Sequence, residues 1–297
     1  MWLKTFRAFE ECGIPIKLAN TFKMKIISEM DVKTDPIDAQ KIANAVRTGM
    51  VPECHVAGQQ ARDARDLIRY RIRMVRDRTA MINRIRSMLD AYDVAVGAAH
   101  LYSKKGITSL KGLDLARKND MMILQSYVRR MENVTEEISG AEEEIKRQVA
   151  SNEDARLLLS LTGIDSFAVL LLASEIDGIS RFRRPEHLVS WAGMCPRVYQ
   201  SGDREYHGRI KKAANRNVNW VVIQAASTAV RHDERMRLFY ERTMERHGRC
   251  HAVVITHVAN KMLRIIWKML TAREEYDSRD TKLCKRKLDR INRALNA

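Results

Sequence analysis

The sequence predicts a mainly α-helical protein, and three observations support this fold class. Aromatic residues make up 6% of the chain, against 45% apolar and 30% charged residues, a composition that suits long helices. Apolar residues recur at helical spacing through most of the chain. Strand-like alternation occurs in one short segment, residues 14–20. The 297 residues carry a prior of about two domains, and changes of pattern divide them into regions 1–58, 59–150 and 151–297.

The charge balance predicts a polyanionic partner. The chain has 53 lysines and arginines against 37 aspartates and glutamates, a formal net charge of +16. Nucleic acid is the first expectation, and a membrane surface the weaker one, because no apolar run of about 18 residues could span a bilayer. Residues 1–20 lack a signal-peptide core. The cysteines form no CxxC pair, which favours the reducing cytosol; they stand at positions 12, 54, 195, 250 and 284.

The N-terminal region begins with a predicted helix, one strand and a second short helix. Apolar residues at positions 2, 3, 6 and 9 mark the first helical face, which ends at Gly13. Ile14, Ile16 and Leu18 alternate as in a strand, and Thr21 can cap the next helix. A lone strand makes no stable sheet. Either its partner comes from elsewhere or the chain starts inside a domain, and we favour the second interpretation.

The segment KTDPIDAQKIANAVRTG (33–49) predicts a further helix. Asp35 takes the N-cap position, Pro36 the first helical position and Gly49 the stop. The expected buried stripe consists of Ile37, Ile42, Ala45 and Val46.

Asp35 and Asp38 are three residues apart, so their carboxylates can point in the same direction. In a purely structural interpretation, Asp35 caps the helix and Asp38 stabilises its positive end. In a functional interpretation the pair binds Mg²⁺, which takes a few carboxylates together with phosphate oxygens of a substrate. Two carboxylates alone make a poor metal site.

The middle region, residues 59–150, predicts an antiparallel coiled-coil hairpin that suits dimerisation. Two apolar runs follow four-three spacing, and glycines at positions 97, 106 and 112 can reverse the chain between them. The first run is Ile68, Ile72, Val75, Thr79, Ile82 and Leu89, interrupted by Arg86; the second is Tyr127, Met131, Val134, Ile138, Ala141 and Ile145. The arginine-rich first arm could lie along a nucleic-acid backbone, although a solvated charged face explains each arginine equally well.

Residues 155–176 predict a helix-hairpin-helix, in which two apolar helices flank the turn Thr162-Gly163-Ile164-Asp165. Amides of this turn, at Gly163 and Ile164, can hold a nucleic-acid phosphate at the start of the second helix. Such helix pairs are also common as plain packing units, and the pattern leaves both interpretations open.

The stretch WAGMCPRVYQSGDREYHGRIKKAANRN (191–217) interrupts the helical pattern and predicts a long loop with a Ser201-Gly202 turn. Long loops in compact domains are usually functional. Ser201 among cations suits a nucleophile that attacks phosphate, because the cations neutralise the charge of the intermediate. A basic surface loop is the plain alternative. Two acids, Asp203 and Glu205, stand against six bases: Arg197, Arg204, Arg209, Lys211, Lys212 and Arg216.

The remaining chain predicts helices from about Ala213, with apolar faces over residues 218–229 and 253–269, and a basic tail. Residues 279–293 hold seven bases against two acids, and such a tail adds nonspecific affinity for nucleic acid. Four residues could suggest a zinc site, namely His247, Cys250, His251 and His257. A helix with polar and core positions explains this cluster better than a bound metal does.

The segment TGIDSFAVLLLASEIDGISRFRRPEHLVSWAGMCPRVYQSGDREYHGRIKKAANR (162–216) resembles the C-terminal domain of the insertion-sequence 110/116/902 transposases. KTDPIDAQKIA (33–43) resembles the end of the N-terminal catalytic domain of the same family. The order of Ala-Gly, Pro, Ser-Gly and Gly-Arg-Ile-x-Lys is specific. With the predicted coiled coil between them, the resemblance covers nearly the whole chain.

That resemblance implies a Holliday-junction-resolvase-type RNase H-like domain with an Asp-Glu-Asp-Asp site for Mg²⁺, of which residues 1–58 would be a partial α/β fragment. It also implies a helical domain with a serine nucleophile, and DNA recombination guided by a bridge RNA in dimers that assemble into tetramers. The last two aspartates of the quartet match Asp35 and Asp38, and the serine matches Ser201. We therefore expect a cytoplasmic, nucleoid-associated transposase.

Departures from the family pattern bear on activity. The first Asp and the Glu of the quartet lie upstream of the residue matching Met1, so we expect negligible strand exchange by this polypeptide alone. Thr162, Asp165 and Ala214 replace a proline and two glycines, which changes turns without removing a catalytic atom. Two other interpretations stay open: a noncatalytic dimeric remnant that binds nucleic acid, and a coiled-coil scaffold. The scaffold leaves the basic serine segment and the net charge unexplained.

Overall fold

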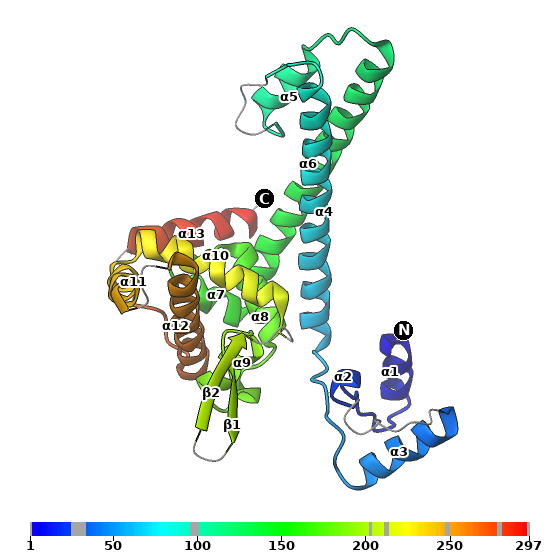
Figure 1. Ribbon diagram of the computed structural model, residues 1–297, viewed down its shortest axis with the longest axis vertical. Coiled ribbons are helices and arrows are strands. Elements are labelled where there is room, and N and C mark those ends of the chain that lie inside the picture. Colours follow the sequence, from blue (N-terminus) through cyan, green and yellow to red (C-terminus); the bar gives the residue numbers. More distant parts are fainter. Residues whose placement is uncertain are drawn as a thin grey trace. The chain divides into compact units, whose positions relative to one another are not determined.

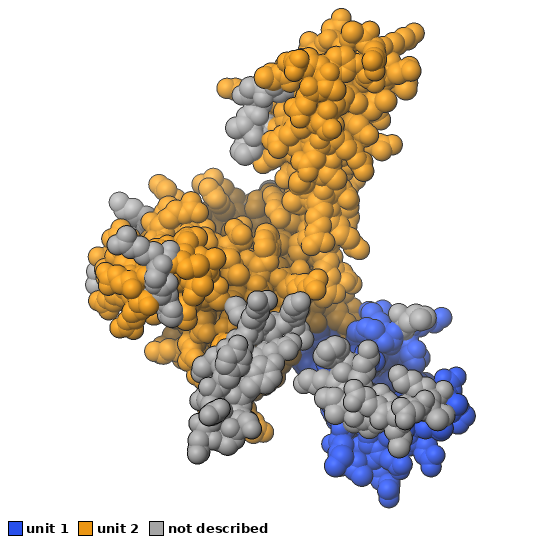
Figure 2. Space-filling view, viewed as in Figure 1, with its two compact units in different colours: residues 1–58 blue, residues 59–297 orange. Residues whose placement is uncertain are grey.

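The computed structural model describes residues 2–24, 34–95, 101–201, 204–210, 214–246, 250–277 and 281–295. Helices dominate these residues, so the mainly α-helical prediction is confirmed (Figure 1). The chain divides into two compact units, residues 1–58 and residues 59–297 (Figure 2). None of the helices in the described ranges is both long enough and apolar enough to cross a membrane.

The described residues of the first unit form three helices and one short contact between extended segments. The helices are α1 (Trp2–Glu11), α2 (Thr21–Met24) and α3 (Asp35–Arg47). Residues 14–20 are not a regular strand, contrary to the prediction, but contribute one antiparallel bridge between Ala19 and Glu53. Beside it, the Asn20 amide donates to the Pro52 carbonyl oxygen at 2.8 Å. The extended segment therefore has its partner within the same unit.

The ends of α3 follow the predicted signals, with a shift of one residue at the start. Thr34 takes the N-cap position, and its side chain makes no capping hydrogen bond, so Asp35 lies in the first turn instead. At the other end, Gly49 has a φ of +69°. The Met50 amide donates to the Ala45 carbonyl oxygen at 2.9 Å, as in a Schellman motif, which confirms the predicted stop.

The predicted buried stripe of α3 is buried only in part, and Ile37 is half-buried. Ala45 is buried at 5% exposure, whereas Ile42 and Val46 are 49% and 54% exposed. The apolar face exists as predicted, but no other described part of this unit covers it. Within the described part of residues 1–58, the buried apolar residues are Ala45 and Ala57.

The second unit starts with a hairpin of two long helices, α4 (Gln59–Asp90) and α6 (Lys118–Ser151), with the short α5 (Lys104–Lys111) between them. Ion pairing and hydrogen bonding show that α4 and α6 run antiparallel. Arg71, early in α4, donates to Glu142, late in α6, at 2.6 Å. Tyr92, just past the end of α4, donates to Asp120 in the first turn of α6.

Apolar side chains pack the hairpin at both ends, with one change from the predicted seam. Ile68 and Leu89 are buried on α4, as predicted, but Ile85 is fully buried while Arg86 and Thr79 are exposed. The stripe steps three residues from Ile82 to Ile85 and four residues from Ile85 to Leu89, so it stays on one face of the helix. Arg86 therefore does not interrupt the seam. On α6, the predicted residues Met131, Ile138, Ala141 and Ile145 are buried, and Tyr127 and Val134 are half-buried.

Shorter helices and one pair of strands make up most of the other described residues of the second unit. They are α7 (Glu153–Leu158), α8 (Ser166–Ile176), the 3₁₀ helix η1 (Ile179–Arg181), α9 (Pro185–Trp191), β1 (Pro196–Ser201), β2 (Arg204–Ile210), α10 (Arg216–His232), α11 (Glu234–Arg246), α12 (His251–Ala272) and α13 (Thr281–Leu295). The predicted loop over residues 191–217 is therefore in large part an antiparallel β-hairpin. Two residues separate its strands, a connection length typical of tight hairpins. The helical pattern resumes at Arg216 rather than at Ala213.

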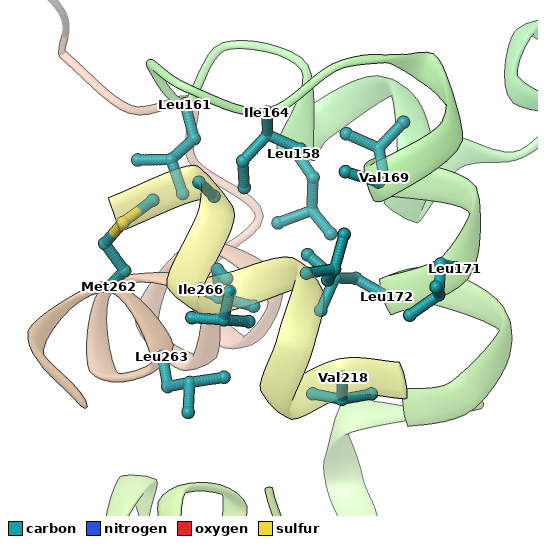
Figure 3. Close-up of a cluster of buried hydrophobic side chains, with 14 of the residues drawn as sticks. Leu158, Leu161, Ile164, Val169, Leu171, Leu172, Val218, Met262, Leu263 and Ile266 are labelled. Carbon is teal, nitrogen blue, oxygen red and sulfur yellow. The ribbon is translucent and has the colours of Figure 1, made fainter. Parts of the chain in front are cut away.

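Helix α8 is the centre of this part of the unit. Every residue from Phe167 to Ile176 is buried, because the sequence is apolar around the whole helix. Helices α4, α6, α7 and α10 pack against it. Figure 3 shows side chains of three helices meeting in this core, among them Leu172 of α8, Val218 of α10 and Ile266 of α12. Each buried aliphatic side chain contributes about 1.5–3 kcal/mol, so this core stabilises the second unit strongly.

The basic tail forms α13, which packs against α6. Ile291 is buried at 3% exposure. The Lys287 ammonium donates to the carbonyl oxygens of Leu159 and Leu161 at 3.0 and 2.9 Å. Part of the tail is therefore held inside the fold, whereas its nonspecific affinity for nucleic acid stays a prediction.

Two residues of the histidine and cysteine cluster, His251 and His257, belong to helix α12. His251 is the first residue of this helix, and its Nδ1 lies 2.7 Å from the Tyr240 hydroxyl oxygen. Cys250 is exposed at the N-cap position, and His247 lies outside the described residues. In the described ranges, no group of three or more His, Cys, Asp or Glu side chains could hold a metal ion.

Candidate functional site

Ser201 is the last residue of β1 and pairs with Arg204, the first residue of β2. Next along the ladder, Tyr199 pairs with Tyr206. The serine thus stands at the end of the hairpin that connects the strands, opposite to the end that joins the helices (Figure 1).

The predicted basic residues are distributed along this hairpin and its exit. Arg197, Arg204 and Arg209 belong to the strands, Arg216 opens α10, and Lys211 and Lys212 lie outside the described residues. The ladder is irregular near its helical end, between the pairs Pro196–Ile210 and Val198–His207. One residue of β1, Arg197, lies opposite two residues of β2, Gly208 and Arg209. Such irregularities twist a strand and redirect it, and they are common next to functional sites. The contacts of these bases with nucleic acid stay a prediction.

The chain entering β1 is fixed by two asparagines from other helices. Asn219 of α10 donates through Nδ2 to the carbonyl oxygen of Ala192 at 3.2 Å. Asn260 of α12 donates through Nδ2 to the carbonyl oxygen of Met194 at 3.4 Å. Met194 itself is buried at 3% exposure. The start of the hairpin is therefore anchored in the core.

The chain leaving β2 is fixed by Asn215, the N-cap residue of α10. Its Oδ1 accepts from the amides of Asn217 and Val218, both at 3.2 Å. Its Nδ2 donates to Glu175 Oε2 at 2.8 Å. Its own amide donates to the Trp191 carbonyl oxygen at 3.4 Å, which joins the two ends of the segment. One asparagine thus caps a helix and closes the base of the hairpin.

Glu175 at the end of α8 connects this anchor to α4. Its side chain is 8% exposed and pairs with two arginines. Its Oε2 lies 3.5 Å from Arg65 Nε, and its Oε1 lies 3.3 Å from Arg69 Nη2. Arg65 also donates to the Ser174 carbonyl oxygen at 2.9 Å. A buried carboxylate needs such partners, because desolvation of an unpaired charge costs several kcal/mol. Sequence reasoning missed Glu175, although a single carboxylate at the end of the apolar run LLLASEI was the available signal.

Arg181 reinforces the same corner of the fold. Its guanidinium donates to the Glu175 carbonyl oxygen at 3.1 Å and lies over the rings of Phe182 and Trp191, at 4.4 and 4.9 Å from their centroids. Burial, with nearby Arg65 as a second cause, lowers the pKa of Arg181 from its ordinary value. Trp191 ends α9 directly before the hairpin, so this contact also supports the serine segment.

The Gly163 turn packs directly against α10. Gly163 has a φ of +90°, and a Cβ there would lie 2.5 Å from the carbonyl oxygen of Ala225. Ile164 is 1% exposed in the core. Asp165 caps α8 by accepting from the Ala168 amide at 2.8 Å, which gives this departure from the family pattern a structural role. Phosphate binding by Gly163 and Ile164 stays a prediction.

Asp35 and Asp38 belong to the first unit, in the first turn of α3. Asp35 is exposed, whereas Asp38 Oδ1 is buried and has no hydrogen-bond partner within the described residues. Lys41 Nζ, one turn further on, is also buried without a partner there. An orphaned carboxylate oxygen beside a second carboxylate fits part of a divalent-metal site.

Comparison with known proteins gives two family models that match the chain. The model described as the Transposase IS116/IS110/IS902 family matches residues 155–241, which include Ser201. A model described as Transposase, for the DEDD type of IS110, matches residues 1–93, which include Asp35 and Asp38.

Individual relatives extend the similarity over most of the chain. The transposase for insertion sequence element IS1111A of Coxiella burnetii is 29% identical over 280 residues, covering 91% of this chain and 75% of the relative. A probable family 20 transposase of Pseudomonas aeruginosa is 23% identical, over 89% and 80%. The transposase for insertion sequence element IS1328 of Yersinia enterocolitica is 26% identical, over 80% and 72%.

Proposed function

Because the chain belongs to the IS116/IS110/IS902 family of transposases, we propose that it recombines DNA through attack of Ser201 on a DNA phosphate. The observation that carries this proposal is the position of Ser201, at the connecting end of a hairpin whose base is fixed on both sides. A nucleophile that must exchange strands benefits from a projecting element on a rigid support.

The chemistry is a transesterification. The Ser201 hydroxyl loses its proton, its Oγ forms an ester bond to phosphorus, and the deoxyribose oxygen leaves with a proton as a hydroxyl group. Attack by another deoxyribose hydroxyl on the serine ester reverses the step and joins new strands. Arg204, the partner of Ser201 in the ladder, would neutralise the additional negative charge on the attacked phosphate, and such electrostatic stabilisation is usually the largest single contribution to catalysis. Arg197 and Arg209, nearer the helical end of the hairpin, would contact neighbouring phosphates.

Asp35 and Asp38 would hold a divalent metal ion, which we propose to be Mg²⁺. Their residue types and the unpartnered Oδ1 of Asp38 support this assignment. When bound, such an ion stabilises charge on the phosphate and leaving oxygens. In this proposal, Asp35 and Asp38 are two of the four carboxylates of the quartet.

Further partners follow from the same proposal. A guide RNA would select the DNA target, and the α4–α6 hairpin would act as a coiled coil that joins two copies, with tetramers formed from dimers. The net charge of +16 supports nucleic-acid partners. Such an enzyme works on the nucleoid in the cytoplasm.

The test is a covalent-adduct assay. Labelled duplex DNA with the end junction of the encoding element is incubated with RNA transcribed from its flanking noncoding DNA, Mg²⁺ and protein, then run on a denaturing gel. The protein is the 297-residue chain and a form that also carries the residues encoded directly upstream. We expect an adduct with the longer form, which Ser201→Ala abolishes.

Tyr199→Phe and Tyr206→Phe are the matched controls, because these two paired tyrosines of the same hairpin offer the alternative hydroxyl nucleophile. Both should retain the adduct. An adduct that survives Ser201→Ala would contradict the nucleophile assignment. Salt-sensitive DNA binding with no adduct in either form would instead favour the noncatalytic remnant.

A further inference from the structure

Beyond the serine hairpin, α4 and the first turns of α10 border a hollow of about 400 Å³. Ile72, Val75 and Arg76 face it from α4, at the one-turn spacing of a single helix face. Arg216 and Trp220 face it from α10, four residues apart and thus also adjacent on their helix. Arg71 and Asn217 complete the lining. The hollow combines an apolar floor with a cationic rim.

Phe167 of α8 fixes the two sides of this hollow relative to each other. The Arg71 guanidinium lies 4.6 Å from the centroid of its ring. The Trp220 ring meets the same ring edge to face, with centroids 6.3 Å apart. Phe167 itself is buried at 8% exposure. The tryptophan is therefore held in a defined orientation while 49% of its surface remains exposed.

The charged side chains among the described lining residues are all arginines. Arg71, Arg76 and Arg216 contribute cations, and none of these described residues is a carboxylate. Arg71 is already paired with Glu142. Arg76 and Arg216 are exposed and make no ion pair with the described residues, and the first turn of α10 has no acidic residue. Two arginines beside the hollow are thus available for an anion.

We propose that this hollow binds an unpaired base of single-stranded DNA, stacked on Trp220, with the flanking phosphates on Arg76 and Arg216. Every base has a π face that a fixed indole can stack on, and arginines on the rim match the negative backbone. Duplex DNA does not fit this chemistry, because its base faces are already stacked. The inference rests on the proposed DNA substrate but is independent of the serine chemistry.

The test is fluorescence anisotropy with a labelled oligo(dT) of about 15 nucleotides. Trp220→Leu keeps an apolar side chain and removes the π face, and should weaken binding about tenfold. Trp220→Phe keeps a stacking ring and should lose much less. Trp2→Leu is the matched control, because Trp2 is similarly exposed, at 47%, and is not among the residues that line the hollow. Arg76→Gln should weaken binding and lower the slope of log affinity against log salt by about one.

Three outcomes would overturn the proposal. In the first, Trp220→Leu binds oligo(dT) as tightly as the unmodified chain does. In the second, Trp220→Phe and Trp220→Leu lose equal oligo(dT) affinity. In the third, substitution of Trp220 weakens the binding of oligo(U) but not that of oligo(dT). Circular dichroism melting of each variant shows whether the fold is retained. The Ser201→Ala adduct assay is read separately: loss of the adduct with unchanged oligo(dT) binding concerns the serine alone.

Discussion

The two regions that carry the predicted catalytic residues differ in how firmly they are built. Ser201 projects from a unit whose central helix α8 is buried on all sides, and both ends of its hairpin are bonded to core residues. Asp35 and Asp38 stand on α3, whose apolar face is largely exposed. The comparison teaches that the serine segment is positioned by its own unit, whereas contacts within the described part of residues 1–58 do little to position the aspartates.

The largest expected effect comes from breaking the anchor at Glu175. Glu175→Ala leaves the Arg65 and Arg69 charges without a buried partner, and should lower the free energy of unfolding by about 3–5 kcal/mol. The matched control is Glu142→Ala, which also breaks an arginine pair on α4, but at a site that is 41% exposed. Glu142→Ala should lower the free energy of unfolding by about 0–1 kcal/mol. Urea denaturation followed by circular dichroism measures both, and equal losses would contradict the role of Glu175.

A core truncation tests the difference between the units themselves. Leu171→Ala in α8 leaves a cavity where the side chain is fully buried and should lower the free energy of unfolding by about 2–5 kcal/mol. Ile42→Ala removes an exposed side chain from α3 and should change it by less than about 0.5 kcal/mol. A comparable loss for both variants would show that the α3 face is covered in solution.

The smallest of these effects concerns the turn against α10. Gly163→Ala places a Cβ against the Ala225 carbonyl oxygen and should destabilise the protein by about 1–3 kcal/mol. Gly140→Ala is the control, because a Cβ there meets nothing within 4 Å on a regular helix, and should stabilise by about 0.5–1 kcal/mol. Thermal melting of both variants gives the comparison; a harmless Gly163→Ala would mean that the turn does not pack against α10.

Much of the fold was predictable from local patterns. Apolar spacing located α4, α6, α8 and α12, and Gly49 marked the end of α3. Such signals act within one or two turns of chain and need no knowledge of the partner. The β-hairpin was missed because a long loop and a short hairpin both interrupt helical spacing. The exposure of Ile42 and Val46 was missed because a periodic stripe shows which face is apolar, but not what covers it.

The candidate site was predictable only in its residue types. The serine before a glycine, the surrounding bases and the Asp35–Asp38 pair are visible in the sequence. The supports are not, because Glu175 bonds to Asn215 forty positions away and Asn260 bonds to Met194 from a different helix. A hydrogen bond between distant positions leaves no periodic signal in a single sequence.

The most direct test of the central claim is to identify the residue that carries DNA. The adduct from the assay above is digested with nuclease and protease, and the modified peptide is sequenced by mass spectrometry. We expect one nucleotide-bearing peptide, which contains residues 198–204, with the phosphate on Ser201. A nucleotide on Tyr199, on Tyr206 or on any residue outside the hairpin would contradict it.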